Sequence, residues 1–132
     1  MLDYQLDFLD TADVFELGTT NFMGMGIANG MLEMFLSIGI GHIHHHVENL
    51  ASRLIHSLLE LNLKVITPIQ TQKRAGIVSI RVPDPNDIIS KLQENQIYAA
   101  VRGDVLRFSL HGTNSMDDVD GILDVLNREI KK

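Results

Sequence analysis

VLRFSLHGTNSMDDVD, residues 105–120, is the stretch that decides the fold of this chain. It opens with a period of two, which predicts a strand with one apolar face, made by Leu106, Phe108 and Leu110. A polar turn at 111–114 follows. Ser115 and Asp118 then form a near capping box, which predicts the start of a helix. The stretch is therefore a strand, a turn and a helix.

Arg107 lies on the other face of this predicted strand. A guanidinium is planar and donates two parallel hydrogen bonds, so it suits a carboxylate or a phosphate. The alternative, from spacing alone, is that Arg107 lies on a solvated strand face and binds nothing.

Apolar periodicity extends the prediction outward to the whole chain. The predicted helices are residues 22–38, 42–62, a third that opens at Asp84-Pro85, and 116–130. The predicted strands are residues 64–67, 76–82, 96–101 and 105–110, the last two joined as a hairpin by the turn 102–104. This order predicts an α+β fold: a two-layer sandwich with a mostly antiparallel sheet of about four strands and helices packed on one face.

Two parts of the chain differ in character. Residues 1–14 show no sustained period, and we predict a lead-in segment followed by one domain at 15–132. The helices at 22–38 and 42–62 are long, apolar and rich in methionine for so small a sheet. Such a face is suited to packing against another domain or another subunit.

Composition excludes several classes of function. The 132 residues carry a net charge of −6, which argues against a nucleic-acid partner. The chain has no cysteine, so it holds no disulfide, thiolate metal site or cysteine nucleophile. Apolar runs stay short of the ~20 residues that span a bilayer, and the acidic N-terminus is unlike a signal peptide. We therefore expect a cytoplasmic protein with no membrane partner.

Two short motifs each allow two interpretations. FELGTTN, residues 15–21, could offer backbone N–H groups and hydroxyls to an anion at a helix start, or could simply cap that helix. HIHHH, residues 42–46, places His42 and His46 on one helix face, but a third ligand at helical spacing is absent. A solvated or interface cluster is favoured there, and we predict no metal site.

Four motifs in order resemble the C-terminal small domain of class V aminotransferase-like enzymes, which are pyridoxal-phosphate (PLP) proteins of fold type I. FELGTTN resembles F-E-x-G-T-x-N, and Ile43, His46, Val47 and Leu50 resemble I-xx-H-[IV]-xx-L. Thr67-Pro68 followed by GIVS at 76–79 resembles T-P…G-I-V-S-F. LRFSLHGTNS at 106–115, followed by DDVD, resembles L-R-[IV]-S-x-H-x-Y-N-T with E-D-[IV]-D. The likeness is nearest to the isopenicillin-N-epimerase-like and cysteine-desulfurase-related branch.

The resemblance implies a role for several positions. Arg107 matches the arginine that holds the substrate's α-carboxylate, and His111 and Asn114 match the substrate loop after it. Gly18 and Thr19 match the pair that contacts the PLP phosphate of the neighbouring subunit, which implies a homodimer. His46 matches a packing histidine. Phe108 and Thr113 depart from the family pattern, the second in the loop that closes over the substrate.

The resemblance also implies that most of the PLP site lies elsewhere. In this family the Schiff-base lysine, the aspartate facing the pyridine nitrogen and the ring-stacking residue belong to a preceding large domain, which nothing here resembles. We therefore predict that this chain holds no catalytic residue and is inert alone, as a fragment or the product of a shortened gene. The desulfurase members carry a catalytic cysteine on a loop between the last two strands, where residues 101–105 form a short turn. That turn favours the epimerase-like or aminotransferase branch.

Two functions follow as expectations. The first is a domain of a PLP enzyme (an aminotransferase, epimerase or lyase) that acts on an amino acid, with Arg107 binding the carboxylate. The second is a stand-alone dimerisation or interaction module that kept the fold and lost the cofactor.

Overall fold

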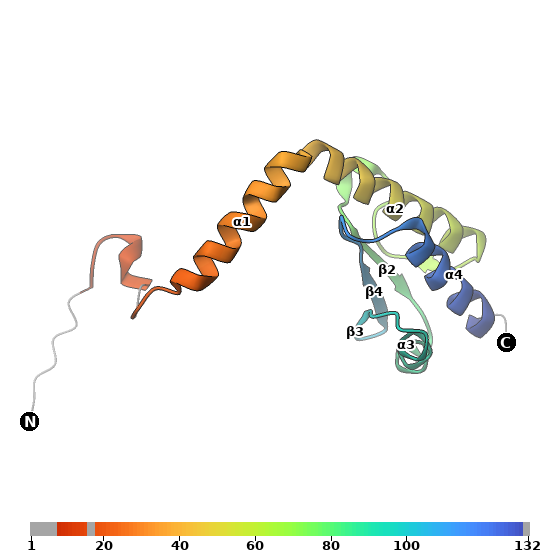
Figure 1. Ribbon diagram of the computed structural model, residues 1–132. Coiled ribbons are helices and arrows are strands. Elements are labelled where there is room, and N and C mark those ends of the chain that lie inside the picture. The colour runs from red at the N-terminus through yellow and green to blue at the C-terminus, as the bar shows by residue number, and fades with distance from the viewer. Residues whose placement is uncertain (1–7, 16–17, 131–132) are drawn as a thin grey trace, which may run out of the picture. The chain divides into compact units, whose positions relative to one another are not determined.

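The computed structural model (Figure 1) describes residues 8–15 and 18–130 of the chain. Its contacts divide the chain into two compact units, Met1–Ile38 and Gly39–Lys132.

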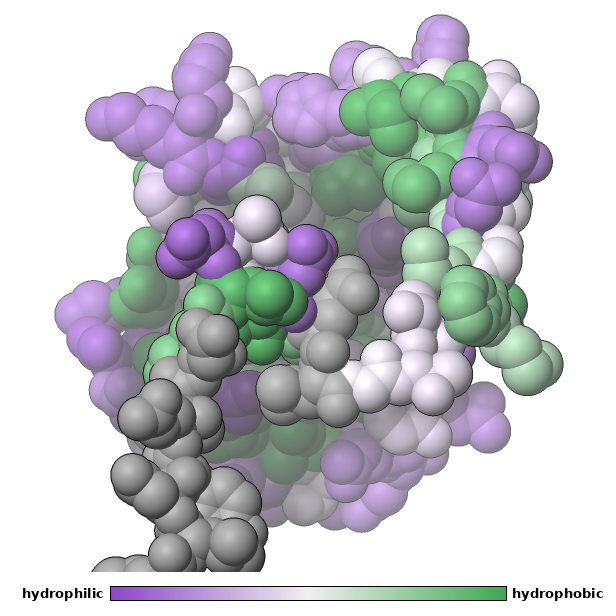
Figure 2. All heavy atoms as spheres, turned by 90° about the vertical axis from the view of Figure 1, so that its left-hand side faces the viewer, coloured by the Kyte–Doolittle hydropathy of each residue, from purple (hydrophilic) through white to green (hydrophobic). Residues whose placement is uncertain are grey.

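The first unit consists of a short 3-10 turn, η1 (Ala12–Phe15), and a helix, α1 (Phe22–Ile38). Asn21 caps α1, because its Oδ1 accepts the backbone N–H of Gly24 at 2.9 Å. The helix has no buried residue. Its side chains that are more than half exposed include Phe22, Met23, Met25, Ile27, Leu32 and Leu36. On the face of the molecule that Figure 2 shows, hydrophobic side chains (green) are exposed among hydrophilic ones (purple).

The second unit contains the remaining elements in the predicted order. Its helices are α2 (Ile40–Glu60), α3 (Pro85–Glu94) and α4 (Met116–Ile130), with a 3-10 turn η2 (Thr71–Lys73). Its strands are β1 (Lys64–Val65), β2 (Ile77–Arg81), β3 (Ala100–Arg102) and β4 (Val105–Ser109). They form one sheet in the order β1-β2-β4-β3, and every neighbouring pair is antiparallel. The α+β prediction is confirmed.

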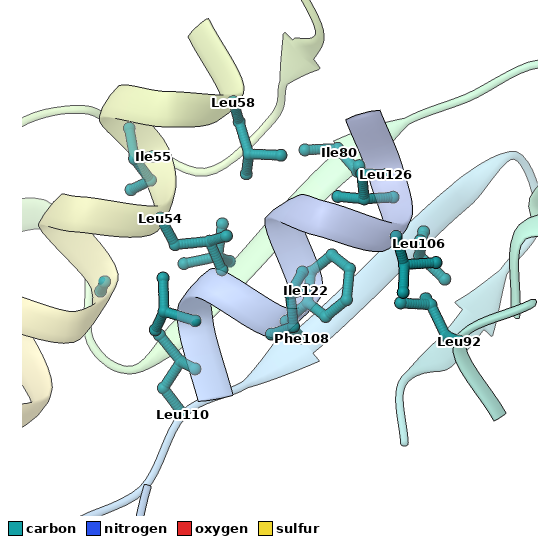
Figure 3. Packing of buried hydrophobic residues seen from close by; sticks show 14 of the residues in the cluster. Leu54, Ile55, Leu58, Ile80, Leu92, Leu106, Phe108, Leu110, Ile122 and Leu126 are labelled. Carbon is teal, nitrogen blue, oxygen red and sulfur yellow. The ribbon is translucent and has the colours of Figure 1, made fainter. Parts of the chain in front are cut away.

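One face of the sheet forms the floor of the core. Val78 and Ile80 of β2 and Leu106 and Phe108 of β4 are at most 1% exposed, as the period of two predicts. Figure 3 shows side chains of α2 and α4 converging on these strands. The helix residues of this core are Leu50, Ala51, Leu54, Ile55 and Leu58 from α2, Ile88 and Leu92 from α3, and Val119, Ile122, Val125 and Leu126 from α4.

Three predicted boundaries are wrong. The strand expected at 96–101 is confined to β3, because Gln96 adopts φ 61° directly after α3 and the chain becomes a strand only at Ala100. The strand expected at 64–67 ends early. Thr67 Oγ1 accepts a hydrogen bond from the backbone N–H of Ser79 at 2.9 Å. At this position a side chain therefore replaces the backbone hydrogen bonding of the sheet. The second helix begins two residues before the predicted position, at Ile40, after Gly39 with φ 91°.

Among the helices of the described chain, no single one is long and apolar enough to cross a membrane. By length and composition, α1 and α2 pass that test only when they are counted together.

Candidate functional site

Arg107 occupies the middle of β4, a strand paired on both sides. Its neighbours in register are Ser79 of β2 and Ala100 of β3. The side chain lies on the face opposite Leu106 and Phe108, away from the core, as predicted. Because β4 is hydrogen-bonded to a strand on each side, the backbone that carries Arg107 is held in place.

The same face of the sheet carries further cations. The strand register places Lys64, Arg81 and Arg102 on it with Arg107, and we call these four residues the basic face. Arg81 forms an ion pair with Asp104. Arg107 differs from the others because its Nε is buried and has no hydrogen-bond partner within residues 8–15 and 18–130. A buried donor without an acceptor costs about 1–3 kcal/mol, so this nitrogen favours an incoming anion.

The loop after β4 is held by a dense set of hydrogen bonds. Asn114 Oδ1 accepts the backbone N–H of His111 at 2.9 Å, and Asn114 Nδ2 donates to Asp118 at 3.2 Å. Ser115 and Asp118 form the predicted capping box: Ser115 N–H donates to the carboxylate at 2.8 Å, and Asp118 N–H donates to the Ser115 hydroxyl at 3.2 Å. The Ser115 N–H, then the Asn114 amide, lower the pKa of Asp118.

His46 contacts this loop. Its Nε2 lies 2.8 Å from the backbone O of Asn114, in a partly buried contact between residues 68 positions apart. Sequence reasoning gave His46 only a packing role, because periodicity places a residue on a helix face and says nothing of its distant partner. The structure therefore adds a polar contact that the histidine motif did not reveal.

The rest of the histidine motif shows no metal site. Within the described ranges, no group of three or more His, Cys, Asp or Glu side chains is placed to hold a metal ion. His44 lies 3.9 Å from Glu48, which is one turn further along the same helix.

Arg74 is a second residue that the sequence did not single out. The polar, basic residues 71–74 would by themselves predict an exposed loop, but Arg74 is only partly exposed. Its Nη2 donates to Ser52 at 2.7 Å, and its Nη1 is buried without a partner in the described part of the chain. It lines a cavity of about 260 Å³ together with His44, Val47 and His111.

Gly18 and Thr19 belong to the first unit, whereas the other predicted site residues belong to the second. Both are exposed, and the helix cap next to them is Asn21. A Cβ built on Gly18 would meet nothing within 4 Å. Asn21 caps α1, as the capping interpretation of this motif expects.

Groups suited to a phosphate and to a carboxylate are both present, in different units of the chain. A backbone N–H and a hydroxyl suit a phosphate, and a guanidinium suits a carboxylate. Lys64 and Lys73 are exposed, and Lys91 is paired with Glu94 at 3.0 Å. Within the described ranges no lysine is enclosed as a cofactor-binding amine would be.

Comparison with known proteins gives consistent results. The family described as the kynureninase C-terminal domain matches residues 43–126. A probable cysteine desulfurase of Pyrococcus abyssi is 33% identical over 134 residues, which cover 89% of this chain and 33% of that protein. The chain therefore spans about one third of the length of this relative.

Solved structures show the same fold. The apo cysteine desulfurase of Thermococcus onnurineus matches with a TM-score of 0.83 and 28% identity, over 98% of this chain and 37% of that one. A cysteine desulfurase of Escherichia coli matches with a TM-score of 0.78 and 17% identity, over 97% of this chain and 36% of that one, which supports the fold alone. The family match covers more than half of the chain. The chain accordingly belongs to the kynureninase C-terminal domain family, the C-terminal small domain of class V PLP-dependent enzymes.

Proposed function

We propose that this domain works as part of a longer PLP-dependent class V enzyme that acts on an amino acid, and that Arg107 binds the substrate's α-carboxylate. The observation that carries the proposal is the buried, unpartnered Nε of Arg107 on a strand paired on both sides. A carboxylate supplies the acceptor that this nitrogen lacks, and the charges of the basic face add to the attraction.

The other predicted site residues each have a role of their own in this proposal. His111 and Asn114 position the loop that follows it, since the Asn114 side chain is fully engaged with His111 and Asp118. Gly18 and Thr19 donate hydrogen bonds to the phosphate of PLP bound in a partner subunit, which makes the active assembly a homodimer. PLP, when bound, supplies the electron sink for the bonds at the amino acid's α-carbon, and this domain holds the substrate in place.

The reaction class follows from what the chain lacks. The sequence contains no cysteine, and β3 and β4 are joined by a tight turn in which Gly103 has φ 62°. We infer that this domain supplies no cysteine nucleophile, although the relatives named above are cysteine desulfurases. An epimerase-like or aminotransferase reaction fits the proposal better.

The test is kinetic and uses the full-length protein that contains this domain. Arg107→Ala is expected to raise KM for the amino acid about 100-fold. The substitution removes a charge-assisted hydrogen bond to the carboxylate, which costs about 2–5 kcal/mol of binding free energy. Arg107→Lys keeps the charge and should recover part of the loss. Arg81→Ala, a control on the same face, removes a cation that already pairs with Asp104 and should change KM less than about threefold.

Two results would contradict the proposal: an unchanged KM in Arg107→Ala, or an equal effect of Arg81→Ala. A companion measurement checks that this chain alone is inert. PLP added to the 132-residue chain should give no absorbance of protein-bound cofactor, and the full-length protein should give it.

The exposed apolar surface of α1 favours a second candidate function. A helix with no buried residue is an unused interface. If the chain acts by itself, that surface would join two copies or dock a partner. Sedimentation equilibrium tests this: a dimer without affinity for PLP supports a stand-alone module, and a monomer that assembles only with a large domain supports the enzyme.

A further inference from the structure

One hydrogen bond links the loop after the substrate arginine to the longest helix. His46 Nε2 and Asn114 O lie 2.8 Å apart and are partly buried. His46 belongs to α2, which is fixed by six buried residues, among them Leu50 and Leu54. The loop is thus tied to an element that the core holds in place.

The residue that His46 contacts is itself hydrogen-bonded to other parts of the loop. Asn114 Oδ1 accepts the N–H of His111 at 2.9 Å, and Asn114 N–H donates to His111 O at 3.0 Å. Asn114 Nδ2 donates to Asp118. Because every polar group of Asn114 is engaged, a constraint on its carbonyl also constrains His111 and the start of α4.

The geometry determines where the His46 proton is. A carbonyl oxygen only accepts, so Nε2 must carry hydrogen. The neutral Nε2–H tautomer and the imidazolium ion both satisfy this condition. The tie therefore holds in either protonation state, and the residue serves as a fixed anchor with no role as a pH switch.

We propose that His46 is a positioning residue for substrate binding: its Nε2–H holds Asn114 O, and through Asn114 it sets the place of His111. This inference rests on the proposed function, in which the loop 111–114 lies beside the carboxylate held by Arg107. A histidine that only filled space on α2 would need no donor, and a ring without nitrogen would replace it.

The first experiment uses the 132-residue chain and tests the anchor alone. His46→Phe keeps a ring and removes the donor, whereas His46→Gln restores an N–H at comparable reach. NMR should find His46 protonated at Nε2 in the wild type. Solvent exchange of the His111 and Asn114 amides should be roughly fivefold faster in His46→Phe, the value of one net hydrogen bond, and near wild type in His46→Gln.

His45→Phe is the matched control, because it makes the same change at an exposed neighbour on the same helix. It should leave the loop amides unchanged. Equal exchange rates in His46→Phe and His45→Phe, or a failure of His46→Gln to restore protection, would overturn the anchor.

The second experiment uses the full-length protein and tests the role in binding. His46→Phe should raise KM for the amino acid roughly fivefold, with kcat and PLP absorbance near wild type, and His46→Gln should reverse the change. In a His111→Ala background, His46→Phe should add nothing, because the anchor acts through that residue.

Failures of the two proposals are distinguishable. If the loop loosens and KM does not change, the positioning role is wrong, while a large effect of Arg107→Ala still supports carboxylate binding. If Arg107→Ala has no effect on KM, the proposed function fails and the positioning inference fails with it, and the amide exchange still reports whether His46 holds the loop.

Discussion

The helices α1 and α2 follow one another in the chain and differ in how they are used. Of the 17 residues of α1, none is buried, although Met23 and Phe22 are large and apolar. Of the 21 residues of α2, six are buried, and five of them belong to the hydrophobic core. Both have an apolar series with helical spacing, so the series predicts a helix and leaves open what covers it.

The difference has a compositional cause. In α2 the apolar residues keep to one stripe, with charged residues such as Arg53 and Glu60 outside it, which is the pattern of a helix covering a sheet. In α1 they surround the helix, and Glu33 is its one charged residue. A helix that is apolar all round is stable in water only when other surfaces enclose it. The second unit therefore has a core of its own, whereas α1 buries none of its residues.

The largest expected effect tests this contrast in the free energy of unfolding. Leu54→Ala in α2 removes a side chain that is 0% exposed and should cost about 2–5 kcal/mol. Ile27→Ala in α1 removes one that is 69% exposed and should change the value by less than about 0.5 kcal/mol. Urea titration of the isolated chain measures both. A loss of several kcal/mol for Ile27→Ala would mean that α1 is enclosed in solution, and its dependence on protein concentration would identify a second copy.

Two glycines, one in each unit, allow the same comparison of stability between the packed second unit and the exposed α1. A Cβ on Gly76, just before β2, would collide with the backbone O of Leu110 and would lie 2.7 Å from Val47 Cγ1. Gly76→Ala should therefore cost about 1–3 kcal/mol. A Cβ on Gly26 in α1 meets nothing within 4 Å, so Gly26→Ala should raise helicity and stabilise α1 by up to about 1 kcal/mol. Thermal melts followed by circular dichroism show whether each variant is more or less stable than the wild type. A Gly76→Ala variant as stable as the wild type would disprove the predicted collision of its Cβ with Leu110 O.

A smaller effect is expected at the end of α3. Gln96 has φ 61°, a left-handed conformation that glycine adopts without strain. Gln96→Gly should stabilise the chain by about 0.5–1 kcal/mol. Gln93→Gly, inside the same helix, should destabilise it by about 1 kcal/mol. The two variants differ only in position, so urea midpoints that shift in the same direction would exclude left-handed strain as the cause.

The smallest effect is a pH dependence at the start of α4. The pKa of Asp118 is lowered from 3.8 by the Ser115 N–H and the Asn114 amide. A lowered folded pKa means that this stabilisation is fully present above the unfolded value and is lost as pH falls through the folded one. Urea stability measured between about pH 6 and 2 should therefore fall less steeply in Asp118→Asn than in the wild type. A flat wild-type profile, or an equally steep fall in Asp118→Asn, would contradict the prediction.

Much of the second unit could be predicted from the order and period of its residues. The alternation around Phe108 placed Arg107 on the face away from the core, and Ser115 with Asp118 predicted the capping box; both are confirmed. The start predicted for the strand at 96–101 was wrong, because the strand begins only at Ala100. Its apolar residues satisfied a local pattern, and Gln96 had already taken a left-handed turn that no composition rule predicts for glutamine.

By itself, the sequence determined the element order, the apolar faces and the resemblance to a PLP enzyme domain, because these depend on side-chain type and near-neighbour spacing. Only the tertiary structure decided which distant groups meet. It bonded His46 to Asn114, left Arg107 Nε without a partner among the residues that the structure describes, and turned Arg74 inward. Such pairings join residues far apart in the chain, and their energies depend on burial and distance, which exist only after the sheet and helices have packed.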